Sequence, residues 1–401
     1  MKEPNIRFKG FRGEWKTSII GDIATFSKGR GYSKSDLRSE GNPIVLYGRL
    51  YTNYSSVIES VDTFASLQNG SVLTKGNEVI IPGSGETPED IAVASAVEQK
   101  GVILGGDLNV LTFDQEKISP AFAAMSITYS NTHNELSGYA QGKTVVHLHN
   151  SSISKGHISY PYIDEQQSIA SYFQHLDSLI QSTTKKIESL KQVKAASLQS
   201  MFPQEGATTP RVRFKGFEGE WEKVRASNVF KTFNEKNRPD LPVLSATQDR
   251  GMVTREAIGY NIFHDKSNEA TYKHILPGQF IIHLRSFQGG FAHSSIEGIA
   301  SPAYTIMEFK DKTRHFDLYW KYIFMSKEFI KRLELITYGI RDGRSISFEE
   351  FSEMYFTVPS YEEQKKIASY ITNLDRQITL HTQRLEKLKQ IKTACLDEMF
   401  V

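Results

Sequence analysis

Residues 165–202 read EQQSIASYFQHLDSLIQSTTKKIESLKQVKAASLQSMF, and residues 363–400 read EQKKIASYITNLDRQITLHTQRLEKLKQIKTACLDEMF. The two stretches share an Ile-Ala-Ser-Tyr segment, a Leu-Asp pair, a Leu-Lys-Gln segment and a final Met-Phe, displaced from 165 to 363, that is, by 198 positions. Solenoid repeats recur every 20 to 50 residues or so, so this much longer period indicates the duplication of a whole unit.

Each copied stretch has the pattern of a long helix. Neither contains Gly or Pro, and apolar residues alternate at spacings of four and three, which predicts a heptad seam. The predicted helix-pair interface consists of Ile169, Phe173, Leu176, Ile180, Ile187 and Leu190 in the first copy and of Ile367, Ile371, Leu374, Ile378, Leu385 and Leu388 in the second. At about 1.5 Å per residue each helix would be roughly 55 Å long. Antiparallel pairing within one chain is the simplest arrangement, and a coiled coil that only dimerises two chains is the alternative.

A second, shorter segment is also copied. Arg7-Phe8-Lys9-Gly10-Phe11 recurs as Arg213-Phe214-Lys215-Gly216-Phe217, a shift of 206 positions from 7 to 213, and each copy is followed by Gly-Glu-Trp. The blocks between the copied segments barely resemble each other. The pattern therefore predicts two variable domains at 1–159 and 213–357, two helices at 160–202 and 358–401, and a linker at 203–212.

The variable blocks mix short strand-like runs with turns. Residues 44–46, 79–81 and 102–104 are predicted strands in the first block, and residues 278–282 repeat the glycine-led pattern of 76–80 in the second. Helices are expected at 120–129 and 318–335. The predicted fold class is therefore α/β (α+β): two mixed α/β domains joined by two long antiparallel coiled-coil helices, with a pseudo-two-fold internal duplication.

Composition limits the kind of protein this can be. The chain has 401 residues, a formal net charge of +2 and one cysteine, so a disulfide framework and a cysteine-based zinc site are both excluded within one chain. No run reaches the roughly 18 apolar residues that a membrane span requires. We expect a cytoplasmic protein with no membrane partner, and any surface for a polyanion must be a local patch.

Glycine-rich polar loops follow the predicted strands in both blocks. Glycine lets a backbone come close to a ligand, Lys and Arg neutralise phosphates, and Arg, Gln and Ser can pair with base edges. The predicted DNA-binding residues are Lys28, Arg30, Tyr32, Tyr47, Arg49, Ser84, Lys143, Gln248, Arg250, Arg285, Ser286, Gln288, Arg341 and Arg344.

Candidate catalytic patterns are weak. Residues 138–144 resemble a phosphate-binding loop but have three residues between the glycines where that motif has four. Asp90, Glu98 and Lys100 loosely match metal-dependent nucleases, and the second block has no counterpart. His147, His149 and His157 lack the Cys or Asp partners typical of a metal site. We therefore expect no catalytic residues, no metal site and no cofactor in this chain.

The copied segments resemble those of the specificity subunits of type I restriction–modification systems. The similarity is most specific at 161–202, at 359–400 and in the two Phe-Lys-Gly-Phe segments. The resemblance implies a non-catalytic subunit that reads a split double-stranded DNA site, one half per variable domain, with the helices fixing the spacer. It also implies two modification subunits, which bind S-adenosylmethionine and methylate adenine, and restriction subunits that use ATP and Mg. A coiled-coil scaffold without DNA readout is the alternative.

Overall fold

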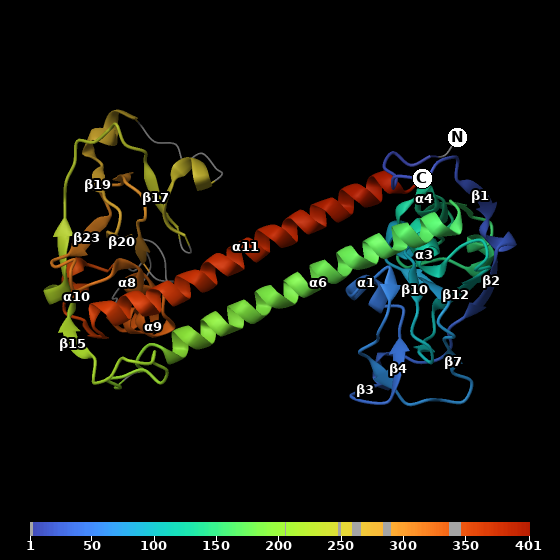
Figure 1. Cartoon of the computed structure of the whole chain (residues 1–401), viewed down its shortest axis with the longest axis horizontal. Coiled ribbons are helices and arrows are strands. Elements are labelled where there is room, and N and C mark those ends of the chain that lie inside the picture. Colours follow the sequence, from blue (N-terminus) through green and yellow to red (C-terminus); the bar gives the residue numbers. More distant parts are fainter. Residues whose placement is uncertain (1–2, 205, 248–249, 259–265, 284–289, 337–345) are drawn as a thin grey trace. The chain divides into compact units, whose positions relative to one another are not determined.

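The computed structural model describes residues 3–204, 206–247, 250–258, 266–283, 290–336 and 346–401 (Figure 1). The chain forms two compact units: an N-terminal unit of residues 1–185 with 382–401, and a C-terminal unit of residues 186–381. The two long helices, α6 (Ile163–Ser200) and α11 (Tyr361–Met399), therefore each contribute one end to each unit. Within the described residues, no helix combines the length and apolarity needed to cross a membrane.

Two five-stranded sheets form the body of the N-terminal unit. The first has the order β2-β12-β8-β10-β5, with bounds β2 (Ala24–Lys28), β12 (Leu108–Phe113), β8 (Glu78–Pro82), β10 (Ser95–Val97) and β5 (Val57–Ile58). The second has the order β3-β6-β4-β11-β7, with bounds β3 (Leu37–Arg38), β6 (Phe64–Ala65), β4 (Asn42–Val45), β11 (Ile103–Leu104) and β7 (Val72–Leu73). The central strand β8 is buried along its whole length, and its residues 79–81 are the apolar run that predicted a strand here.

Short elements complete the N-terminal unit. Strand β1 (Lys16–Ile19) pairs with β14 (His157–Tyr160), and β9 (Ser84–Gly85) pairs with β13 (Val146–His147). The helices are α1 (Arg49–Thr52), α2 (Pro88–Ile91), α3 (Pro120–Tyr129), α4 (Asn131–Gly138) and α5 (Asn150–Ile153). Helix α3 has the predicted bounds. It begins at a Pro, and the Ser119 side chain caps it by accepting the Phe122 N–H.

The C-terminal unit repeats the central part of this plan. Its main sheet has the order β16-β23-β20-β21, with bounds β16 (Phe230–Phe233), β23 (Thr305–Phe309), β20 (Phe280–Ile282) and β21 (Phe291–His293). Three antiparallel pairs accompany it: β15 (Glu222–Arg225) with β24 (Tyr355–Val358), β17 (Leu244–Thr247) with β18 (Gly251–Thr254), and β19 (Lys273–Ile275) with β22 (Gly298–Ala300). Its helices are α7 (Ala226–Val229), α8 (Asp317–Phe324), α9 (Lys327–Ile336) and α10 (Phe348–Ser352), so the single helix expected at 318–335 is two.

Burial along the two long helices follows the predicted heptad spacing. Of the twelve residues predicted at the helix-pair interface, nine are buried, and Ile180, Ile378 and Leu388 are half-buried. Thr183, which the pattern also places on the seam, is 6% exposed. Inside the N-terminal unit, the start of α6 packs against the end of α11, because Ile169 and Phe173 share a core with Leu396 and Met399. The pairing there is antiparallel, as predicted.

The copied Arg-Phe-Lys-Gly-Phe segments hold each long helix at its first turn. Arg7 donates two hydrogen bonds to Glu165, at 2.6 and 2.7 Å, and Arg213 does the same to Glu363, at 2.7 Å for both. Each of these carboxylates is 1% exposed. The hydrogen bond to Glu165 raises the pKa of Arg7 above its usual value. The copied motif is thus a structural joint between each domain and its helix.

The copied glutamines next in sequence have matching roles. Gln166 donates to the carbonyls of Lys117 and Pro161 and accepts from the Ser119 N–H. Gln364 donates to the carbonyls of Arg314 and Pro359 and accepts from the Phe316 N–H. Both amides are buried, so their fully paired groups fix the loop that precedes α3 or α8 against the helix start.

Candidate functional site

Three loops of the N-terminal unit are joined through their backbones at one end of the first sheet. We call residues 29–33, 83–87 and 105–107 the loop cluster. The N–H of Gly106 donates to the Gly31 carbonyl at 2.5 Å, and the N–H of Gly83 donates to the Asp107 carbonyl at 2.7 Å. Buried Asn109 on β12 donates to the carbonyls of Pro82 and Leu148. These bonds fix the loop cluster to the sheet.

The loop cluster and helix α1 border a cavity of about 1460 Å³. Four of the predicted DNA-binding residues line it together: Tyr32, Tyr47, Arg49 and Ser84. Because they come from three separate segments, the fold has gathered positions that are up to 52 residues apart, from 32 to 84. The sequence singled out these four residues one by one and did not indicate that they share one cavity.

Most of these four side chains are already engaged within the unit. Arg49 pairs with Asp62 at 2.7 Å and keeps the pKa of that carboxyl low. The Tyr32 hydroxyl lies 2.5 Å from Ser71 Oγ and accepts the Gln68 N–H. Ser84 Oγ is hydrogen-bonded to His147 Nδ1 at 2.9 Å. These three residues therefore shape the wall of the cavity.

Tyr47 differs, because it is 41% exposed and its hydroxyl has no hydrogen bond to any described residue. The remaining predictions in this unit, Lys28, Arg30 and Lys143, lie outside the cavity lining and are exposed. None of the three forms an ion pair with a described residue, so their charges are available to a ligand.

Tyr51 and Asp107 are among the lining residues that the sequence did not indicate. Tyr51 follows Tyr47 by one helical turn, and its hydroxyl donates to the Ser84 carbonyl at 2.7 Å. Burial raises the pKa of Tyr51. Asp107 lies on the lining with a backbone φ of +61°. The signal for Asp107 was the preceding Gly105-Gly106 pair at the entry to a strand, a pattern typical of a tight loop.

In the C-terminal unit, most of the predicted residues lie outside the described part of the chain. These are Gln248, Arg285, Ser286, Gln288, Arg341 and Arg344. Arg250 is described, is exposed and donates to the Ala257 carbonyl at 3.3 Å. The N–H of His283 donates to the Gly290 carbonyl at 2.8 Å, which joins the two ends of the segment between β20 and β21.

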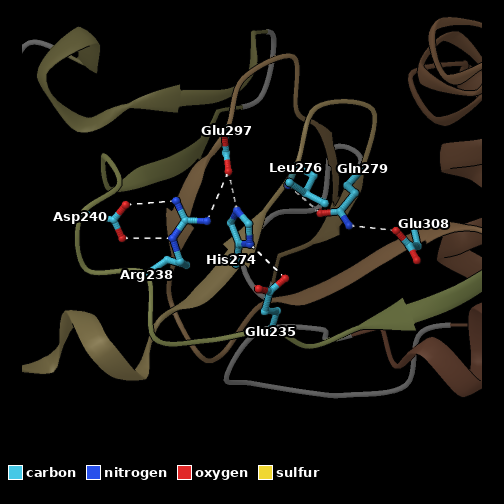
Figure 2. Close-up of polar contacts among 8 residues, drawn as sticks. All are labelled: Glu235, Arg238, Asp240, His274, Leu276, Gln279, Glu297 and Glu308. Carbon is cyan, nitrogen blue, oxygen red and sulfur yellow. Dashed lines mark hydrogen bonds and ion pairs between the residues drawn. The ribbon is translucent and has the colours of Figure 1, made fainter.

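A buried histidine organises one edge of the same unit (Figure 2). His274 on β19 is 3% exposed, and its two ring nitrogens contact Glu235 at 3.2 Å and Glu297 at 2.9 Å. Arg238 forms two hydrogen bonds with Asp240 and also approaches Glu297. The cluster ties together segments next to β16, β19 and β22.

The fold does not support the weak catalytic patterns found in the sequence. Residues 139–144 follow the end of α4 rather than linking a strand to a helix, as a phosphate-binding loop would require. Asp90 accepts from Thr87 as part of a helix cap, and Glu98 accepts from Gln174. Across the described residues, no group of three His, Cys, Asp or Glu side chains is arranged to hold a metal ion.

Comparison with known proteins gives the family. The sequence profile described as "Type I restriction modification DNA specificity domain" matches residues 12–192 and again residues 218–390. The chain is 22% identical to the type I restriction enzyme MjaVIII specificity subunit of Methanocaldococcus jannaschii, over 98% of this chain and 94% of that protein.

The fold is also known. The crystal structure of the S subunit of a type I restriction–modification system from M. genitalium matches with a TM-score of 0.62 at 14% identity, over 100% of this chain and 99% of that one. The two profile matches, one in each half of the chain, correspond to the two compact units of the structure. The chain belongs to the family of type I restriction–modification specificity subunits.

Proposed function

We propose that this chain is the non-catalytic DNA-reading subunit of its complex and binds a split double-stranded DNA site, one half-site per unit. The observation that carries the proposal is a difference between two sets of residues: those that are copied between the two halves of the chain, and those that are not. Copied residues form pairs within the protein, Arg7 with Glu165 and Arg213 with Glu363. The loops at the end of the sheet, which are not copied, contain polar side chains without a partner among the described residues. The residues that join each domain to its helix are thus the same in both halves of the chain, whereas the candidate DNA contacts differ between the halves.

The chemistry of the loops supports this role in the N-terminal unit. Lys28, Arg30 and Lys143 are exposed cations suited to phosphates, which position a protein on DNA without reading sequence. The cavity beside them offers Tyr47, Asp107 and backbone groups of glycines, which suit base edges. A division between phosphate contacts and base contacts is typical of sequence-specific DNA binders.

We further propose that the helices set the distance between the half-sites and dock two modification subunits. Helix α6 has 38 residues and α11 has 39, which at about 1.5 Å per residue is just under 60 Å each. In this proposal S-adenosylmethionine, ATP and Mg belong to the modification and restriction subunits in the cytoplasm, and adenine is reached by base flipping in the partner.

The test is methylome sequencing of cells that co-express the chain with its modification subunit. A split motif with modified adenine is expected. Replacing residues 19–159 by the corresponding block of another family member should change one half-site and keep the other. Deleting or inserting one heptad within 180–194 should change the spacer and preserve both half-sites. Two half-sites that survive the block exchange unchanged would refute the proposal.

The competing scaffold function makes the opposite prediction for the free cations. If the chain only holds other subunits together, neutralising Lys28, Arg30 and Lys143 together leaves modification of the genome intact. DNA recognition instead predicts weaker binding and a smaller dependence of affinity on salt, because fewer counterions are released. The same comparison can be made with Arg285, Arg341 and Arg344.

A further inference from the structure

The cavity beside the loop cluster has a charge pattern unsuited to phosphates. Its lining includes five carboxylates, namely Asp62, Glu86, Glu89, Asp90 and Asp107, against two cations, Lys34 and Arg49. Arg49 is already paired with Asp62. A DNA backbone phosphate placed here would be repelled, so the groups that fit are hydrogen-bond donors.

Asp107 is the carboxylate that the fold positions most firmly. Its backbone is held in the left-handed region at φ +61°, with its carbonyl bonded to the Gly83 N–H. A Cβ on Gly83 would lie 2.6 Å from Asp107 Oδ1, so glycine at 83 keeps space for this side chain. The neighbouring wall residue Tyr32 is also left-handed, at φ +59°, where a bulky residue is rare. Such backbone is retained where surrounding bonds over-determine it.

The Asp107 side chain itself is unengaged. It is exposed on the cavity lining, and its carboxylate makes no hydrogen bond or ion pair with any residue that the structure describes. By contrast, Asp62 and Asp90 accept hydrogen bonds from Arg49 and Thr87. Asp107 therefore combines a fixed backbone with two free acceptor oxygens.

DNA presents two kinds of donor in the major groove, the N4 amino group of cytosine and the N6 amino group of adenine. Adenine places the acceptor N7 beside its donor, and a carboxylate has no proton for that acceptor. Cytosine has no acceptor at that position. Resting on the proposed function, we propose that Asp107 is a specificity-determining residue that accepts a hydrogen bond from the N4 amino group of a cytosine in one half-site.

The test variant is Asp107→Asn, because Asn tolerates the left-handed backbone and keeps the size of the side chain. An amide can donate to N7 and accept from N6 of adenine. The methylome of cells expressing the variant with the modification subunit should show cytosine replaced or joined by adenine at one position of one half-site. Binding of the purified complex to duplexes carrying each base there should change its cytosine-to-adenine preference by about ten- to a hundredfold.

Asp114→Asn is the matched control. Asp114 follows β12 as Asp107 precedes it, and it is paired with Lys117 at the opposite end of the strand. This variant should leave the motif unchanged, and equal melting temperatures for both variants would show that folding is not the cause. Asp107→Gly, which relieves the left-handed backbone and removes the acceptor, should accept several bases at the same position.

The outcomes separate the two proposals. An unchanged motif in Asp107→Asn, with a split motif in the parent, overturns the role of Asp107 and leaves the proposed function standing. A change in the other half-site also overturns it. Loss of assembly with the modification subunit, at constant base preference, would instead identify a contact with a basic protein segment and overturn the inference. A parent complex without any split motif refutes the proposed function itself.

Discussion

Removing one ring at the end of α11 should destabilise the N-terminal unit. Phe400 is 8% exposed and lies 5.7 Å from the Phe122 ring, 5.9 Å from Phe173 and 6.4 Å from Trp15, centroid to centroid. Replacing a buried Phe by Ala costs about 3–5 kcal/mol, from lost burial and the cavity left behind. Phe400→Ala should therefore lower the free energy of unfolding of the N-terminal unit by that amount.

The copied residue provides the matched variant. Phe202, at the end of α6, is also 8% exposed, but its ring stacks on Tyr319 at 5.4 Å in the core of the C-terminal unit. Phe202→Ala should cost a similar free energy in the C-terminal unit. Each variant thus destabilises the unit in whose core its helix ends, which is not the unit in which that helix begins.

Hydrogen exchange measured by mass spectrometry can resolve the units. In Phe400→Ala, amides of β12 should lose protection by about two to three orders of magnitude where exchange reports opening of the whole unit, while amides of β23 keep theirs. Phe202→Ala should give the reverse. If Phe400→Ala lowered protection in β23 and spared β12, or if neither strand changed, the described packing of the helix ends would be wrong.

Three further predictions concern one joint, one salt bridge between the long helices and one half-buried histidine. Arg213→Met should lower the free energy of unfolding in urea by about 3–5 kcal/mol, because Glu363, 1% exposed, is left buried without its partner. The double variant with Glu363→Gln should recover most of that loss. An unchanged free energy of unfolding in the single variant would contradict the prediction. Lys194→Asp should weaken the pairing of the helices, because Lys194 lies 2.5 Å from Asp375, and adding Asp375→Lys should restore about 1 kcal/mol in a double-mutant cycle; strictly additive effects would show that the pair is not coupled. Burial lowers the pKa of His315 to about 4. The unfolded chain, with a His pKa near 6.5, therefore binds the proton first as pH falls. The free energy of unfolding should drop between about pH 6.5 and 4, by roughly 1–2 kcal/mol after discounting for partial exposure, and His315→Gln should flatten that dependence.

The helices were predictable because their information is local. Period and spacing placed the seam residues, and the buried Thr183 shows that the pattern is right even where the residue is polar. Lys194 and Lys392 fall on the same heptad spacing, where a charged residue ordinarily weakens a seam. Instead each is paired across it, with Asp375 and Asp177, at 2.5 Å in both cases. The partner of each lysine lies on the other helix, so spacing within one helix could not reveal it.

The candidate site was only partly predictable, for a physical reason. Loop residues such as Tyr47 and Ser84 have the right chemistry, but whether a hydroxyl is free depends on contacts across the fold. The Tyr32 hydroxyl is taken by Ser71 and Gln68, and Ser84 is taken by His147. Asp107 has only the preceding Gly105-Gly106 pair as a sequence signal, and that pair indicates a tight loop rather than a binding residue. Its significance comes from a backbone conformation and from a gap at Gly83 that only the folded chain defines.

The lysine–aspartate pairs also explain how one chain can specify a single register between two similar helices. Lys194 follows Asp177 by 17 residues, from 177 to 194, and Lys392 follows Asp375 by the same 17, from 375 to 392. In an antiparallel pair, this equal spacing lets each lysine meet the aspartate of the other helix, Lys194 with Asp375 and Lys392 with Asp177. A slip by one heptad would separate both pairs and move polar residues onto apolar neighbours. A register that depends on partly buried charges costs some stability and gains uniqueness, which suits the proposed role of the helices in setting the distance between the half-sites.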